Sequence, residues 1–105
     1  MYNRFMPAIS VPHEAIADFC RRQHIRKLSF FGSVLRDDFG PNSDIDVLVE
    51  FDPQHIPGLM RFVGMEIELS KIFGGRKVDL NTPKSLGHHL RNRVLAEAQS
   101  QYVET

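Results

Sequence analysis

Two acidic residues open the segment DIDVLVEF at residues 44–51, which is otherwise apolar and rich in β-branched side chains. In a strand, side chains at positions i and i+2 point to the same face, so Asp44 and Asp46 are predicted to project side by side. Neighbouring carboxylates repel each other, and burying them unpaired raises the pKa of at least one. A divalent cation relieves this repulsion, and Mg²⁺ is typically held by one or two carboxylates together with substrate phosphates. The pair therefore indicates metal-assisted phosphate chemistry.

A third acidic residue, Asp79, stands between the apolar Val78 and Leu80 in the segment RKVDLNT (76–82). We expect this segment to be a short strand. Pairing beside 44–51 would bring Asp79 to the first two acids and complete a cluster of three carboxylates. Such a cluster is what a two-metal site for phosphoryl or nucleotidyl transfer requires, with two ions about 3.5–4 Å apart that clamp the attacking and leaving oxygens.

The segment before the acidic pair carries candidate phosphate ligands. Gly32 and Ser33 follow a predicted strand and precede a predicted helical turn. At such a place glycine allows close approach of the backbone, and helix-start N–H groups and a hydroxyl can donate to phosphate oxygens. Arg36 lies one turn later, and Ser43 directly precedes the acidic pair. Each feature alone has an ordinary structural explanation, since Gly-Ser turns and solvated Asp-x-Asp pairs are common. Their combination favours a nucleotide-binding site.

Hydrophobic spacing and turn signals predict the order α-β-α-β-α-β-α along the chain. The predicted elements are a helix over about 10–24, a strand over 26–31, one or two helical turns within 33–39, a strand over 44–51, a helix over about 59–73 closed by Gly74-Gly75, a strand within 76–82, and a last helix. Thr82 is expected to cap the last helix, with Pro83 at its first position. The stripe that this helix buries would hold Leu86, Leu90 and Val94. The predicted class is α+β (α/β), a small mixed β-sheet with helices packed on it.

Composition and length narrow the class of protein. A chain of 105 residues favours one domain over 1–105, with a core over about 10–98. No run approaches the roughly 20 apolar residues that span a bilayer, and the first ten residues lack the apolar core of a secretory signal. Cys20 is a single cysteine, which favours the reducing cytoplasm. Thirteen basic residues balance thirteen acidic ones, which argues against nucleic acid as the direct substrate.

The combined motif reads Gly32-Ser33, ten residues, Asp44-x-Asp46, and a later strand acid at Asp79. This pattern resembles the nucleotidyltransferase superfamily typified by DNA polymerase β, and within it the minimal nucleotidyltransferases (MNT). The resemblance implies the polymerase β-like nucleotidyltransferase fold. It also implies that Gly32 and Ser33 hold the triphosphate of the nucleotide. Asp44 and Asp46 would bind two catalytic Mg²⁺ ions, and Asp79 would bind one of them and help to activate the attacking hydroxyl.

Resemblance to the MNT family also implies a partner. Members of this family are commonly antitoxins paired with a HEPN-domain RNase toxin, and they transfer AMP from ATP to a tyrosine hydroxyl of the toxin. About 23 residues follow Thr82, enough for one helix, so we expect an open acceptor side that a partner protein completes. The balanced charge fits a protein acceptor better than an RNA or DNA acceptor. The expected protein is therefore a cytoplasmic protein adenylyltransferase that uses ATP and Mg²⁺.

Two other functions are compatible with the same sequence. One is a nucleotidyltransferase that acts on a small molecule or an RNA end. The other is a non-catalytic antitoxin that neutralises its toxin by occlusion. The intact set of acids argues against the second, although catalysis and occlusion can coexist. No residue that reads the base is identifiable, so the preferred nucleotide stays open.

Overall fold

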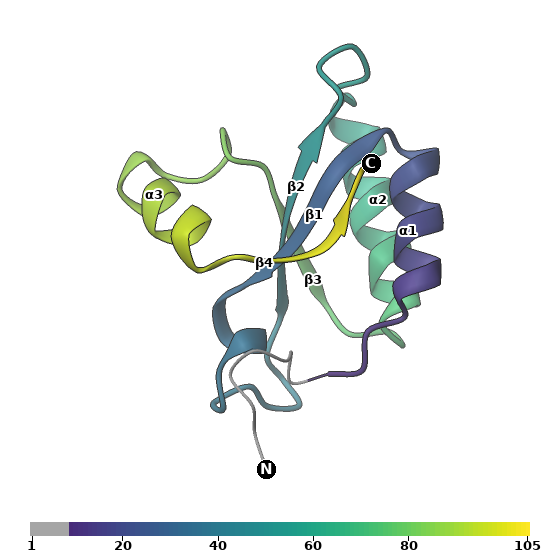
Figure 1. The fold of residues 1–105 in the computed structure, drawn as a ribbon. Coiled ribbons are helices and arrows are strands. Elements are labelled where there is room, and N and C mark those ends of the chain that lie inside the picture. Colours follow the sequence, from purple (N-terminus) through teal and green to yellow (C-terminus); the bar gives the residue numbers. More distant parts are fainter. Residues whose placement is uncertain (1–8) are drawn as a thin grey trace.

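A computed structural model describes residues 9–105 of the chain. Residues 1–8, over which the sequence predicts no secretory signal, lie outside this range. The elements are α1 (His13–Arg22), β1 (Ile25–Phe31), the 3₁₀ turn η1 (Gly32–Leu35), β2 (Ile45–Phe51), α2 (Leu59–Ile72), β3 (Val78–Asn81), α3 (His88–Glu97) and β4 (Gln99–Val103). The strands form one sheet in the order β3-β2-β1-β4, which Figure 1 shows with its flanking helices.

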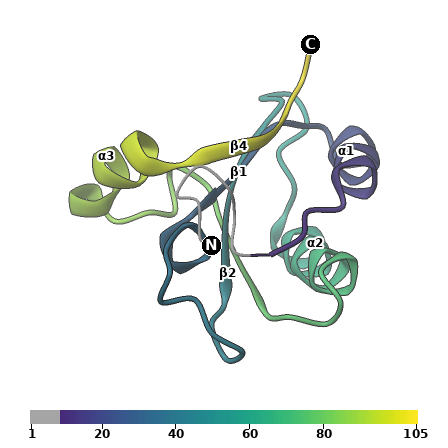
Figure 2. The same cartoon turned by 60° about the horizontal axis from the view of Figure 1, so that its bottom comes forward.

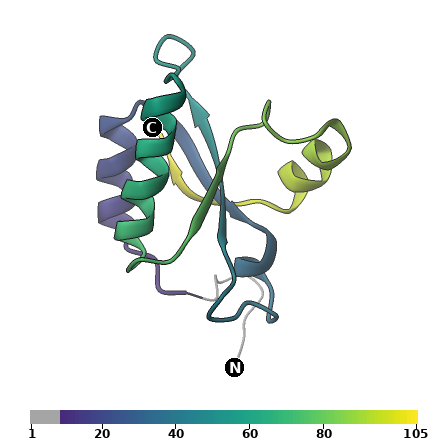
Figure 3. The ribbon, with the colours of Figure 1, turned by 180° about the vertical axis from the view of Figure 1, so that it is seen from behind.

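The sheet is mixed. β1 is antiparallel to both β2 and β4, whereas β2 and β3 are parallel and are joined through α2. A parallel pair needs such a crossover, because a tight hairpin can join only antiparallel strands. α1 and α2 lie side by side on one face of the sheet, and α3 lies apart from them (Figures 2 and 3). The predicted mixed sheet with packed helices is confirmed.

The main core lies between the sheet and the α1–α2 layer. Alternate residues of β2, namely Ile45, Val47 and Val49, are completely buried there, as the period-two pattern predicts. The same cluster includes Ile16, Phe19, Cys20, Leu28, Phe30, Met65 and Leu69. Leu48 points to the opposite face of the sheet, where it packs with Leu86 and Val94 below α3. Asp46 of β2 also lies on that opposite face and is only partly buried.

The start of the last helix was predicted wrongly. α3 begins at His88, five residues after Pro83. Thr82 and Ser85 form a closed turn instead, in which the Thr82 N–H donates to Ser85 Oγ (2.9 Å) and the Ser85 N–H donates to Thr82 Oγ1 (3.1 Å). The two hydroxyls therefore satisfy the turn rather than capping a helix. The predicted stripe is also partly wrong, because Leu90 is exposed.

β4 is a strand that the sequence pattern does not predict. Its sequence, QSQYV, carries little of the apolar alternation that marks a strand. β4 pairs with β1 as an edge strand, from Lys27 opposite Val103 to Phe30 opposite Gln99. The segment after α3 thus completes the sheet, and the predicted order ending in a helix was wrong. Within residues 9–105, no helix is both long and apolar enough to cross a bilayer.

We expect Phe30→Ala to lower the free energy of unfolding by about 3–5 kcal/mol, because it empties a fully buried position. Phe30 is 0% exposed in β1, and its ring centroid lies 5.6 Å from that of Phe73. Urea denaturation measures the loss. Val103→Ala on β4 is the control and should change stability by less than about 0.5 kcal/mol, since this side chain is largely exposed. Equal, small losses for both variants would contradict this placement of the core.

Candidate active site

Parallel pairing of β2 with β3 brings the predicted acids together. In the observed register Asp46 is the partner of Asp79, and Ile45 is the partner of Val78. Ile45 and Val78 are buried in the α1–α2 face of the sheet, so the two aspartates turn to the opposite face. Asp44 precedes β2 by one residue. The three acids therefore meet on one face, at the ends of β2 and β3 where both strands begin.

The electrostatics of Asp46 reflect this crowding. The pKa of the Asp46 carboxyl is raised to about 6 from the ordinary value of 3.8, and burial is the largest cause. The negative charges of Asp79 and Asp44 and a hydrogen bond with Asp79 contribute to this rise, whereas Arg36 opposes it. Without a cation, the site therefore disfavours full ionisation of its own carboxylates.

Gly32 lies directly against this cluster. Its φ of +74° is in the left-handed region that glycine adopts without strain. A Cβ added at this position would overlap Oδ2 of Asp46 and lie 3.3 Å from its Cγ. Any side chain at Gly32 would thus displace the Asp46 carboxylate. The absence of a side chain is what lets the backbone between β1 and η1 approach the acids.

The segment from Gly32 forms one helical turn, within the predicted range of one or two. A single 3₁₀ turn, η1, covers Gly32–Leu35 and ends where Arg36 becomes extended, with φ −121° and ψ 164°. The Arg36 N–H donates to the Ser33 carbonyl (2.9 Å) and closes this turn. The Arg36 side chain is exposed and pairs with Asp38 at 3.5 Å. Ser33 therefore follows Gly32 within this turn, and Arg36 acts on Asp46 through its charge.

Ser43 takes part in a tight turn that delivers the chain to Asp44. The Ser43 N–H donates to the Gly40 carbonyl (3.1 Å), and its Oγ accepts from the Gly40 N–H (3.0 Å). Arg76 clamps the same turn, because its guanidinium donates to the carbonyls of Gly40 (2.7 Å) and Ser43 (2.9 Å). It also lies over the Phe39 ring, 4.4 Å from the centroid. Arg76 was not among the predicted site residues, since these carbonyls lie more than 30 residues away in the chain.

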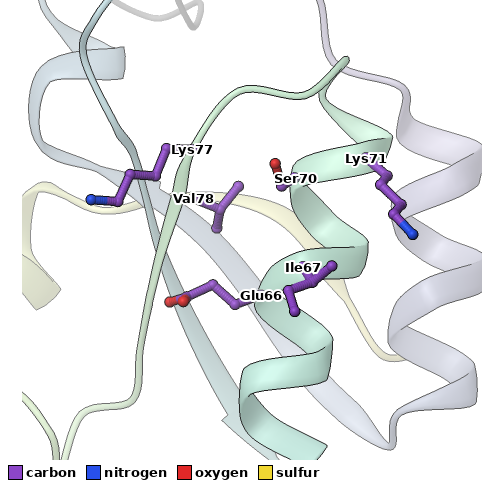
Figure 4. A pocket seen from close by; sticks show the side chains of 6 residues that line it. All are labelled: Glu66, Ile67, Ser70, Lys71, Lys77 and Val78. Carbon is purple, nitrogen blue, oxygen red and sulfur yellow. The ribbon is translucent and has the colours of Figure 1, made fainter.

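Two further residues support β3. The Leu80 N–H, on the open edge of the sheet, donates to Oε2 of Glu66 on α2 (2.9 Å). Lys77, one residue before β3, places its Nζ 3.8 Å from Oδ2 of Asp44. Figure 4 shows Glu66 and Lys77 beside a hollow of about 310 Å³ between α2 and the start of β3. Val78 lines this hollow and Asp79 faces the other way, whereas Lys77 lies between the hollow and Asp44.

Comparison with known proteins shows the family of this chain. A family model described as nucleotidyltransferase domain matches residues 13–100. The chain belongs to this nucleotidyltransferase family. Over 73 residues it is 37% identical to the protein adenylyltransferase MntA of Thermococcus cleftensis, which covers 70% of this chain and 71% of that relative.

Solved structures share the fold of this nucleotidyltransferase. A crystal structure of a toxin–antitoxin with AMP-PNP matches with a TM-score of 0.73 at 18% identity, over 90% of this chain and 76% of the other. A complex of tri-AMPylated Shewanella oneidensis HEPN toxin with MNT antitoxin matches with a TM-score of 0.63 at 18% identity, over 87% and 69% of the two chains. At such identities these matches establish the fold alone.

The donor set of the nucleotidyltransferase fits Mg²⁺. Asp44, Asp46 and Asp79 supply the carboxylate oxygens that this ion prefers, and a cation would offset the burial and the repulsion that raise the pKa of Asp46. Across residues 9–105, no three His, Cys, Asp or Glu side chains are placed closely enough to hold a metal ion by themselves. An open arrangement is compatible with Mg²⁺, because substrate phosphates and water typically complete its coordination.

We expect Gly32→Ala to lower the free energy of unfolding by about 1–3 kcal/mol, since alanine is strained at positive φ. The added Cβ would also push the Asp46 carboxylate aside, so stabilisation of the protein by Mg²⁺ with a nucleotide should be lost. Thermal unfolding with and without these ligands measures both effects. The matched control is Gly64→Ala in α2, where nothing lies within 4 Å of the new Cβ and stability should rise. Gly32→Ala with normal stability and ligand response would contradict the close approach.

The raised pKa of Asp46 predicts a pH dependence in the metal-free protein. Between the unfolded pKa of 3.8 and the folded pKa of about 6, the folded state keeps a proton that the unfolded state has released. The contribution of Asp46 to stability therefore falls as pH rises through this window. Asp46→Asn removes the fall, so its melting temperature relative to the native protein should be higher at pH 7 than at pH 4, measured in EDTA. The exposed Asp18→Asn on α1 is the control. A difference between Asp46→Asn and the native protein that does not change with pH would refute the assignment.

Proposed function

We propose that this nucleotidyltransferase is a Mg²⁺-dependent protein adenylyltransferase and an antitoxin. It would transfer AMP from ATP to a tyrosine hydroxyl of a HEPN-domain RNase toxin, with which it assembles in the cytoplasm. Residues 1–105 would act as one minimal nucleotidyltransferase domain. The observation that carries the proposal is the pairing of Asp46 with Asp79 beside Asp44, on the face of the sheet that Gly32 approaches.

Two findings among relatives support this choice of reaction and partner. The relative from Thermococcus cleftensis is a protein adenylyltransferase, and it aligns over most of both chains. The structural neighbour from Shewanella oneidensis is an MNT antitoxin in complex with an AMPylated HEPN toxin. A nucleotide also fits the position of Gly32 and Ser33, beside the acids and at the start of η1.

Each residue has a role that its placement supports. Asp44 and Asp46 would hold two Mg²⁺ ions, and Gly32, Ser33, Ser43 and Arg36 would hold the nucleotide. When bound, Mg²⁺ neutralises phosphate charge and stabilises the leaving diphosphate. Asp79, which would also bind one ion, lies exposed opposite Asp46, where it can orient the tyrosine hydroxyl and take its proton. The phenolic oxygen then bonds to the α-phosphorus, while the bond from that phosphorus to the diphosphate oxygen breaks.

Positioning accounts for most of the expected rate, because phosphoryl-type transfer asks little covalent chemistry of the protein. Gly32 lets the backbone that would bind phosphate approach the acids, and Arg76 fixes the turn that leads into Asp44. The acids are partly exposed rather than enclosed, with the Asp44 side chain 40% accessible. A tyrosine on the surface of a folded partner could therefore reach them.

We expect Asp44→Asn and Asp46→Asn each to lower the rate of AMP transfer to the co-expressed toxin by about 100-fold or more. Asp79→Asn should also be severely impaired, because its amide cannot accept the proton. Intact-protein mass spectrometry of the toxin, followed by peptide mapping to the modified tyrosine, measures the transfer. Asp18→Asn on α1 is the matched control and should transfer AMP normally.

The same experiment separates the competing functions. Undiminished transfer by Asp44→Asn would refute the metal-site assignment. A stable complex without an AMP adduct, formed equally well by Asp44→Asn, would favour neutralisation by occlusion. Incorporation of nucleotide into RNA or a small molecule in place of the toxin would favour the other enzymatic function.

A further inference from the structure

The strand register that pairs Asp46 with Asp79 also places the Lys77 side chain beside Asp44. The parallel ladder continues one step before β3, where the Ile45 N–H donates to the Lys77 carbonyl (2.9 Å). Lys77 and Asp79 are two residues apart and share a face of the sheet, as do Asp44 and Asp46. Two pairs of side chains therefore lie next to each other: the repelling pair of Asp46 with Asp79, and the attracting pair of Lys77 with Asp44.

The contact between Lys77 and Asp44 is loose. Nζ lies 3.8 Å from Oδ2, and the two side chains are 80% and 40% exposed. Exposed ion pairs of this kind contribute about 0–1 kcal/mol, so another cation can replace the ammonium at little cost. The free end of Lys77 extends away from α2, on a flexible four-carbon stem (Figure 4). The side chain can thus leave Asp44 without disturbing the core.

We propose that Lys77 is an exchangeable counter-ion of the active site: it neutralises Asp44 in the metal-free protein and moves to the phosphates of the nucleotide when Mg²⁺ takes its place. The inference rests on the proposed function, because it takes Asp44 as a Mg²⁺ ligand. It assigns a nucleotide-binding residue that the Gly-Ser and acidic motifs do not include.

When Mg²⁺ and nucleotide are both bound, the charges of the site favour the position of Lys77 at the phosphates. Three carboxylates and two divalent cations leave about one net positive charge, and a triphosphate of about four negative charges then makes the whole strongly negative. A released ammonium within one side-chain length would bind those phosphate oxygens through charge-assisted hydrogen bonds. Lys77 therefore opposes metal binding when no nucleotide is present and supports nucleotide binding once the metal is in place.

Opposite shifts in two affinities are the signature of this exchange. The affinity for Mn²⁺ alone, measured on the full chain by the EPR signal of the free ion, should be about two- to fivefold tighter in Lys77→Met. The affinity for AMP-PNP with saturating Mg²⁺, measured by calorimetry, should be about tenfold weaker. Lys77→Arg should restore nucleotide binding, because it restores the positive charge.

Lys71 offers a matched control. It also borders the hollow between α2 and β3, but it points away from β3 (Figure 4), and Lys71→Met should change neither affinity. Unchanged Mn²⁺ affinity in Lys77→Met, or shifts of both affinities in the same direction, would overturn the exchange.

Asp44→Asn distinguishes this failure from a failure of the proposed function. If Asp44→Asn loses both affinities while Lys77→Met behaves like the native protein, only the exchange is wrong. If Asp44→Asn keeps both affinities, the metal site itself is wrong.

Discussion

The close approach of Asp46 and Asp79 is the constraint on which the candidate site depends. Two carboxylates face each other across adjacent parallel strands, and a charged pair in this position opposes folding. The opposite side of the same strands supplies the compensating free energy. Ile45 and Val78 are partners one step earlier in the register, and both are buried against the helical layer. The hydrophobic core therefore holds in place a charge arrangement that the site alone would not maintain.

Backbone geometry on both sides of the acids limits how they can relax. The Asp46 carboxylate leaves no room for a side chain at position 32. The turn that ends at Ser43 is closed by its own hydrogen bonds and by Arg76. Such a site is organised before any ligand arrives, so little binding energy has to be spent on ordering it. The ordered backbone around the acids thus keeps their carboxylates close together despite their repulsion.

The acids could be predicted because strand geometry is local. Asp44 and Asp46 share a face through the period of two, and the only long-range assumption was that the strand of Asp79 pairs beside theirs. Arg76 could not be predicted in the same way, since its partners are backbone carbonyls that carry no sequence signal. Lys77 could have been found by extending the period-two argument back from Asp79. β4 was missed because it is polar, and its attachment to β1 depends on backbone pairing. Thr82 was misassigned because a hydroxyl that closes a turn resembles one that caps a helix.

The bond between Glu66 and the Leu80 N–H has a consequence for how any partner can approach. Strands at the border of a sheet invite pairing with foreign strands through their unused N–H and C=O groups. Here a side chain from α2 occupies one such donor on β3, immediately beside Asp79. Strand addition at this border would have to break that bond. The sheet thus discourages growth at its reactive border, and a protein that delivers an acceptor group must do so from above the open face.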